Sequence, residues 1–290
     1  SPTTTTQTME PIMMALPIIL HRQLPKHRQL PRHQRRQLPP EGTLAMIPTQ
    51  TQDTTGTPAM TINRPPLRFR HEYKHLISPS EDAVLSGRLG RLFPRDSHAG
   101  PSGTYRVCSL YFDTPDDRAL RQKLNGTDNR EKFRIRYYGD SADFFRLEKK
   151  IKKNTLCAKR SASLTEEEVQ MILEGRHDFL LESPNGLLVE FYSKLKGQLL
   201  TPRTVVSYER EAFVYPPGNV RVTLDRHIRR GLSPERFLFP QSREIPADPG
   251  HTILEGKYDA FLPDIVRMAV QVPGRAAGAY SKYAACRRCD

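Results

Sequence analysis

Residues from Leu67 onward alternate between apolar and charged side chains with a period of two. In the segment 68–74, Phe69 and Tyr73 lie on one side of an extended chain and the charged residues lie on the other. The same alternation recurs in 132–137, 146–152 and 221–228, and further strands are expected over 105–114, around 208–210 and over 252–259. The pattern therefore predicts a series of short, half-buried strands.

Helix start signals interrupt these strands at two places. Ser78 followed by Glu81, and Thr165 followed by Glu168, each form the sequence pattern of a capping box. Two further helices are expected, a short basic one over 116–126 and an amphipathic one over 186–200. About eight mostly consecutive strands with a few helices predict an α+β fold, mainly antiparallel β: an eight-stranded closed β-barrel tunnel with flanking helices. We place this single domain at 67–283, followed by a short tail over 284–290.

Composition divides the chain into two parts. Residues 1–62 are rich in Thr, Pro, Gln and His and repeat the letters RQLP, which predicts a disordered low-complexity tail.

The net charge of the whole chain is +13, which favours an anionic partner: nucleic acid, a membrane surface or a phosphorylated small molecule. The apolar run 11–20 is too short to span a bilayer. Few cysteines and no spanning segment predict a cytoplasmic protein, and the CxxC of Cys286 and Cys289 lacks two further metal ligands nearby.

The polar faces of the predicted strands carry many more cations than acids. Lys132, Arg134 and Arg136 share one face, and a solvated sheet would explain any one such strand. Like charges on neighbouring strands repel, however, and a bound polyanion would remove that repulsion. The aromatic residues Phe133 and Phe145 lie on the opposite faces, whereas single-stranded nucleic acid needs aromatic stacking on the basic face. The pattern therefore favours phosphate groups over bases.

An ordered set of short motifs resembles a known family. The motifs are EYKHLI (72–77), SLYFDT (109–114), FRIRYYG (133–139), LEKKIKK (147–153), YERxAF (208–213), RVTLD (221–225), ILEGKYD (253–259) and SKY (281–283). Together they resemble the VTC domain, the polyphosphate polymerase domain of the triphosphate tunnel metalloenzyme (CYTH-like) superfamily, in its bacterial form. The resemblance implies an antiparallel tunnel in which the γ-phosphate of ATP is transferred to a growing inorganic polyphosphate chain.

The resemblance also implies roles for individual residues. The implied catalytic residues are Arg134, Arg136, Lys150, Arg210 and Lys282. The implied substrate-binding residues are Lys74, Lys123, Lys159, Tyr208 and Arg221. Glu255 is the implied ligand of Mn²⁺ or Mg²⁺, although it could simply pair with Lys257. Glu72 and Glu148 are weaker metal candidates for which ion pairing with neighbouring lysines is the favoured role, and the histidines His71, His75 and His227 are expected to be structural.

The expected partners are ATP and inorganic polyphosphate, with no specific nucleic acid, and membrane association would come only through a membrane-protein partner. Two other functions remain open: hydrolysis of a triphosphate in the same tunnel, and non-catalytic binding of polyphosphate or inositol polyphosphates. RNA binding is the least favoured. The sequence departs from the family at Gly256, where a β-branched residue is expected and a loosened strand follows. A C-terminal helix that closes one tunnel mouth is expected to be short or absent.

Overall fold

The computed structural model describes residues 66–272, 274 and 278–288, so the predicted tail over 1–62 lies outside the described residues. The strands are β1 Arg70–Ile77, β2 Thr104–Asp113, β3 Arg130–Tyr138, β4 Phe145–Lys153, β5 Leu156–Leu164, β6 Thr201–Tyr215, β7 Val220–Gly231, β8 Glu244–Pro246 and β9 Thr252–Tyr258. The α-helices are α1 Pro79–Leu92, α2 Arg118–Leu124, α3 Glu166–Leu173, α4 Gly186–Gly197, α5 Asp264–Ala269 and α6 Lys282–Cys286. In this part of the chain, no helix is long and apolar enough to cross a bilayer.

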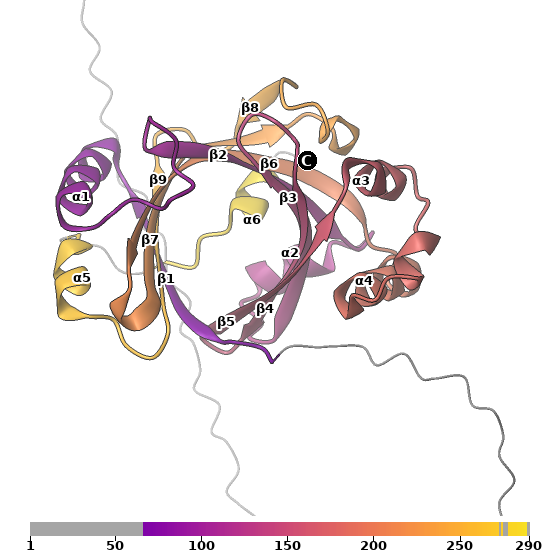
Figure 1. Cartoon of the computed structure of the whole chain (residues 1–290), viewed down its shortest axis with the longest axis horizontal. Helices are drawn as coiled ribbons and strands as arrows, with labels where there is room; N and C mark the ends of the chain where they lie inside the picture. The colour runs from indigo at the N-terminus through magenta and orange to yellow at the C-terminus, as the bar shows by residue number, and fades with distance from the viewer. Residues whose placement is uncertain (1–65, 273, 275–277, 289–290) are drawn as a thin grey trace, which may run out of the picture. The chain divides into compact units, whose positions relative to one another are not determined.

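Eight of the strands close into an antiparallel barrel (Figure 1). Their order is β6-β2-β3-β4-β5-β1-β9-β7, and β7 pairs again with β6 to complete the ring. The short strand β8 extends the sheet beyond the ring by pairing with the end of β7. The predicted fold, an eight-stranded closed barrel with flanking helices, is confirmed.

Strand alternation divides the side chains between the barrel interior, called the lumen below, and the outer surface. Apolar residues on the outside of β2, β3 and β4 pack against α3 and α4; Phe191 of α4 stacks on Phe133 at 5.4 Å between ring centroids. Apolar residues on the outside of β1, β7 and β9 pack against α1 and α5. Figure 1 shows these two helix pairs on opposite sides of the barrel. The charged positions of the strands are thereby turned inward.

The local signals for helix starts are confirmed. The Ser78 hydroxyl accepts a hydrogen bond from the Glu81 amide at 3.4 Å, and the Glu81 carboxylate accepts one from the Ser78 amide at 2.7 Å. Thr165 and Glu168 form the same reciprocal pair. These caps satisfy amide groups that the first turn of a helix leaves free.

Strand β5 had no clear signal in the sequence. Its buried outer positions include Ala158 and Ala162, which are too small to mark an apolar stripe, and its inner positions include Lys159 and Ser161. Pairing with β4 along its whole length, from Lys153↔Leu156 to Phe145↔Leu164, defines this strand. Tertiary pairing therefore supplies what the local pattern lacks.

The C-terminal helix α6 lies inside the ring of strands (Figure 1). Tyr283 and Cys286 are buried there, the Tyr283 hydroxyl donates to Asp113 at 2.8 Å, and the Tyr283 ring stacks on Tyr111 at 5.1 Å. The helix has five residues, so it is short as expected, but it is present. It extends past the expected domain end at 283, and the residues as far as Cys286 belong to the packed domain.

Gly256 does not loosen strand β9 as the sequence suggested. It pairs with Tyr73 of β1, and a Cβ atom added to it would lie 2.0 Å from Cζ of the Tyr73 ring. The ring covers the glycine, and Leu254, Glu255 and Gly256 are all buried. The glycine is needed for this close approach of an aromatic ring to the backbone.

We expect Gly256→Ala to destabilise the protein by about 1–3 kcal/mol, because the new methyl group overlaps the Tyr73 ring. Equilibrium unfolding in denaturant measures the change. Gly87→Ala in α1 is the control; its added Cβ meets nothing within 4 Å and should stabilise the helix by up to about 1 kcal/mol. A full cost for Gly256→Ala in a Tyr73→Ala background would contradict the explanation.

Candidate functional site

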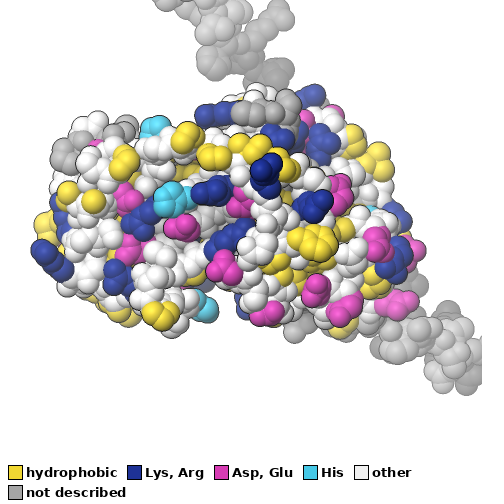
Figure 2. Space-filling model, turned by 90° about the horizontal axis from the view of Figure 1, so that it is seen from above, with side chains coloured by type: hydrophobic (Ala, Val, Ile, Leu, Met, Phe, Trp, Pro, Cys, Tyr) yellow, Lys and Arg dark blue, Asp and Glu magenta, His cyan; other side chains and the backbone are white. Residues whose placement is uncertain are grey.

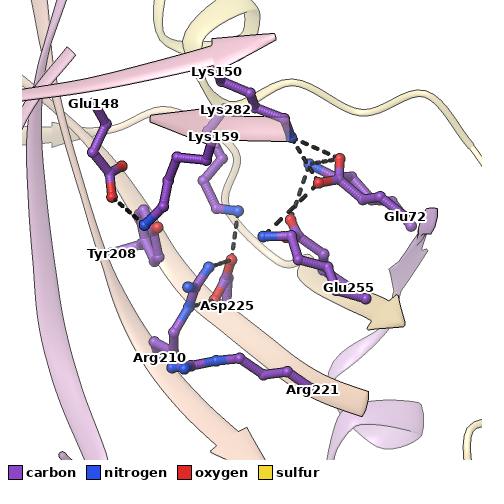
Figure 3. A network of polar contacts seen from close by, with 12 residues as sticks. Glu72, Glu148, Lys150, Lys159, Tyr208, Arg210, Arg221, Asp225, Glu255 and Lys282 are labelled. Atoms are coloured by element: carbon purple, nitrogen blue, oxygen red, sulfur yellow. Dashed lines mark hydrogen bonds and ion pairs between the residues drawn. The ribbon is translucent and has the colours of Figure 1, made fainter. Parts of the chain in front are cut away.

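Three clusters of cations line the lumen, and each surrounds one or two buried carboxylates (Figure 3). The first surrounds Glu148 of β4. Arg134 contacts its Oε2 at 2.7 Å, Lys159 its Oε1 at 2.9 Å, and Arg136 lies 3.7 Å from Oε2. Burial alone would raise the pKa of Glu148, but Arg134, Arg136 and Lys159 outweigh it and hold the pKa well below its usual range. The carboxylate therefore stays ionised and fixes three cations.

The second cluster contains Glu72 of β1 and Glu255 of β9. Lys150 reaches Glu72 at 2.7 Å, and Lys74 lies between the two acids, 3.4 Å from Glu72 and 3.0 Å from Glu255. Lys257 contacts Glu255 at 2.5 Å. Burial opposes ionisation of both acids, yet the lysines lower the pKa of Glu72 to about 2 and that of Glu255 well below its usual range. Both acids are thus charged at neutral pH.

The third cluster surrounds Asp225 of β7, which is completely buried. Arg210 donates to both carboxylate oxygens, at 2.7 and 2.8 Å, and Lys282 of α6 contacts Oδ2 at 2.5 Å. The Tyr208 ring lies beneath both cations, 5.3 Å from the Arg210 guanidinium carbon and 4.6 Å from the Lys282 amine. The Tyr208 hydroxyl accepts a hydrogen bond from Arg136 at 3.1 Å, which links this cluster to the first.

Two of the expected binding residues lie apart from these clusters. Arg221 donates to the Tyr105 hydroxyl at 2.7 Å and forms an ion pair with Asp96, which lies between α1 and β2. Lys123 of α2 donates to the backbone carbonyl of Ala279. The other eight predicted phosphate-binding residues all belong to the three clusters, and so does Glu255, the predicted metal ligand.

Several residues that complete the site were not among the predicted site residues, although the sequence did suggest Lys257 as an ion-pair partner of Glu255. Asp225 and Lys257 lie in motifs that were recognised, RVTLD and ILEGKYD, at positions that alternate with the outer core residues. Ser109 and Tyr111 of β2 also point inward, and they accept hydrogen bonds from Arg136 at 3.0 Å and from Arg134 at 2.8 Å. The two-residue period already placed Asp225 and Lys257 on the charged faces of their strands, and its use on β2 would have found Ser109 and Tyr111.

The carboxylates of the second cluster fit a hard divalent cation. In the described chain, no three His, Cys, Asp or Glu residues are gathered closely enough to hold a metal by themselves. Mg²⁺ and similar ions, however, are often held by one or two carboxylates together with phosphate oxygens of the substrate. Glu255 and Glu72 are ionised, face the lumen and share Lys74, so they offer such a donor pair.

The three histidines of the barrel strands, His71, His75 and His227, lie outside the lumen. The sequence predicted structural or incidental roles for them. His71 stacks on Tyr258 at 4.9 Å, and His227 pairs with Glu209 on the surface. On the face that Figure 2 shows, Lys and Arg side chains lie among acidic and apolar ones. That face presents no surface of a single sign for a nucleic acid backbone.

A sequence model of the VTC domain matches residues 69–289, which includes every strand of the barrel and α6. The chain belongs to the VTC domain family. No curated protein matches this VTC domain. The family and the cation-lined lumen together support a triphosphate-tunnel enzyme.

Solved structures resemble this VTC domain at low sequence identity. A Bacillus halodurans protein assigned as an adenylate cyclase is 17% identical with a TM-score of 0.43, and the match covers 72% of this chain and 95% of that one. A Hippeastrum protein, assigned as an adenylyl cyclase and described as having a dominant triphosphatase activity, is 15% identical with a TM-score of 0.43, covering 69% and 83%.

We expect Asp225→Asn to destabilise this VTC domain by about 3–5 kcal/mol, because it leaves the buried cations of Arg210 and Lys282 without their counter-ion. Denaturant unfolding with and without tripolyphosphate measures the change, and the anion should recover part of the loss. The control is Asp264→Asn, which removes an exposed pair with Arg267 and should cost less than about 1 kcal/mol. Equal stability of Asp225→Asn and the unchanged protein would contradict the role of this carboxylate.

Proposed function

We propose that the protein is a polyphosphate polymerase that transfers the γ-phosphate of ATP to the end of an inorganic polyphosphate chain in the lumen. The observation that carries the proposal is the set of cations held by buried carboxylates, which links strands on all sides of the barrel. Phosphoryl transfer depends mainly on positioning and charge neutralisation. The lumen is built to supply both.

Arginines and lysines can bind phosphate in different ways. Arg134, Arg136 and Arg210 present planar donor groups that can meet two phosphate oxygens at once, whereas lysines act as mobile point charges. Each arginine is already oriented by an acceptor within the protein: Glu148, Ser109 or Asp225. These acceptors hold the arginines in place before phosphate binds, and donors positioned in advance favour transition-state stabilisation.

The transfer step needs no protein base. A terminal oxygen of the acceptor chain, already anionic, forms a bond to the γ-phosphorus while the bond between that phosphorus and the β,γ-bridging oxygen breaks. The bridging oxygen keeps the electron pair and leaves as part of ADP, so no proton has to move. Among the described residues no histidine contacts the three clusters, in keeping with this step.

Exclusion of bulk water favours transfer over hydrolysis. Glu148 is 1% exposed, and Arg136, Arg210 and Lys282 are 5%, 8% and 8% exposed. Electrostatic interactions are stronger among such buried groups than in water, and a lumen filled by ATP and the phosphate chain would leave little room for a water molecule to compete with the phosphate nucleophile. This burial is the reason to prefer a polymerase to a triphosphate hydrolase.

Glu255, helped by Glu72, would hold Mn²⁺ or Mg²⁺. Such an ion neutralises charge on the reacting phosphates when bound. Lys74 and Lys257, which form ion pairs with Glu255, would then be available to the phosphate chain. In this proposal ATP and inorganic polyphosphate are the ligands, the protein acts in the cytoplasm, and any membrane association comes through a membrane-protein partner.

Purified protein with ATP and Mn²⁺ should produce acid-labile polymer together with ADP. Arg134→Ala should lower the rate by about 100-fold or more, because it removes a donor from the charge-stabilising site. Lys159→Gln should also lower the rate while perturbing the fold less, since its side chain is half exposed. Polymer formation, resolved by gel electrophoresis and scored against ADP release, measures both effects.

Lys196→Gln on the outer surface of α4 is the control and should leave the rate unchanged, with circular dichroism confirming that each variant is folded. Orthophosphate release without polymer would replace the proposal with a triphosphate hydrolase. Tight polyphosphate binding with no turnover under either metal would identify a non-catalytic binding protein.

We expect Glu255→Gln to weaken Mn²⁺ binding, because the amide carries no charge and is a poorer ligand for a hard cation. The electron paramagnetic resonance signal of free Mn²⁺ reports binding without any turnover. The matched control is Glu209→Gln, since Glu209 lies on the surface beside His227 and should leave binding unchanged. Equal Mn²⁺ binding by Glu255→Gln and the unchanged protein would contradict the assignment of Glu255.

A further inference from the structure

A second basic site lies at the end of the lumen where β3 begins and β4 ends. A pocket of about 470 Å³ opens there beside α2 and the C-terminal end of α4, and it is called the rim pocket below. Its volume falls within the range of ligand sites, about 300–1,000 Å³. Six cations line it: Arg118, Arg130, Lys132, Lys152, Lys153 and Lys194.

Most of these cations have no acidic partner, unlike those of the three lumen clusters. Within the described residues, only Lys194 forms an ion pair, with Glu131 at 2.6 Å. The two carboxylates of the rim pocket are already engaged. Glu131 is also paired with Lys149 at 2.6 Å, and Asp113 accepts hydrogen bonds from backbone amides at the start of α2 and from Tyr283. The rim pocket therefore carries positive charge that the protein does not compensate.

Burial and neighbouring positive charges lower the pKa values of two lysines at this end of the barrel. Burial and then the charge of Arg130 lower the pKa of Lys132 to about 7, although Asp113 opposes the change. Burial and then Arg130 and Lys152 lower the pKa of Lys123 as well. An anion placed among these groups would relieve the repulsion and favour their charged forms. The charge of the rim pocket therefore favours a ligand of high negative charge.

Two cations of the rim pocket, Lys132 and Lys152, continue the rows of lumen-facing cations on β3 and β4. Lys132 stands two positions before Arg134 on β3, and Lys152 stands two positions after Lys150 on β4, so all four face the same side of the sheet. The Lys132 amine also lies 4.9 Å from the ring centre of Tyr283, the neighbour of Lys282 in α6. A phosphate chain held by Arg134 and Lys150 would meet the rim pocket next.

We propose that the rim pocket holds the segment of the polyphosphate chain that extends out of the lumen, and that it thereby retains the growing chain between additions. This inference rests on the proposed function, because it assigns one end of the same lumen to the acceptor chain. A linear polyphosphate fits the site better than a nucleic acid, since the two aromatic residues of the rim pocket, Phe112 and Phe133, are buried and present no exposed ring face on which bases could stack.

The test compares long-chain polyphosphate with tripolyphosphate, which is too short to occupy the lumen clusters and the rim pocket together. The variant carries Arg118→Gln and Lys153→Gln, two exposed rim residues outside the three clusters. Its affinity for long-chain polyphosphate should fall by about tenfold or more, because two charged hydrogen-bond donors are lost. Its affinity for tripolyphosphate should change far less. Calorimetric titration of the folded variant measures both.

The control variant carries Arg91→Gln and Arg267→Gln, which remove the same two charges from the exposed surfaces of α1 and α5. It should bind both anions as the unchanged protein does, and this separates a local site from a general loss of positive charge. Equal weakening in the two double variants, or no weakening in the rim variant, would overturn the proposal.

The binding comparison remains readable if the protein makes no polymer, so its failure differs from failure of the proposed function. If polymer is made, the rim variant should release shorter chains than the control variant, as judged by gel electrophoresis at equal ATP consumption. Polymer of unchanged length from the rim variant would contradict retention of the chain at the rim pocket.

Discussion

The structure depends on compensation of positive charge inside a closed barrel. Glu72, Glu148, Asp225 and Glu255 stand among the inward-facing arginines and lysines, and each is ionised because cations surround it. Without these four acids, the repulsion between neighbouring strands would oppose closure of the ring. With them, the empty barrel can fold and its cations stand in fixed positions before any phosphate arrives. The same contacts that stabilise the fold thus prepare the site.

This compensation also limits how tightly the lumen can hold a phosphate chain. An entering phosphate competes with carboxylates for the same donors, so part of its interaction free energy is spent on breaking pairs that already exist. A polymerase needs this moderation, since a chain bound too tightly could not move along after each addition. The rim pocket differs because, within the described residues, only one of its six cations, Lys194, is paired with a carboxylate, which suits holding a chain more than reacting with it.

Much of the fold followed from the sequence because its information is local. The two-residue period of β3 and β4 assigned Arg134, Arg136 and Lys150 to one face, and the capping boxes at Ser78 and Thr165 located two helices. Strand β5 was not predicted from the sequence, because its buried alanines are too small to produce an apolar pattern. The packing of α6 inside the barrel could not be predicted for a different reason. The ion pair between Asp225 and Lys282 joins residues 57 positions apart, and no local sequence pattern indicates such a contact. The excess of cations was evident, whereas the pairing of each cation with a particular acid was not.

The position of β1 in the ring has a consequence for how the protein comes to be folded. This first strand pairs with β5 only at Arg70 and His71, but with β9, the last strand, along His71–Ile77. During synthesis β1 must therefore wait, with most of its hydrogen-bonding groups unpaired, until the end of the domain leaves the ribosome. Lys74 and Glu255 meet across that same seam. Closure of the barrel and assembly of the two-carboxylate cluster therefore occur together, late in folding. A truncated chain that lacks β9 can complete neither.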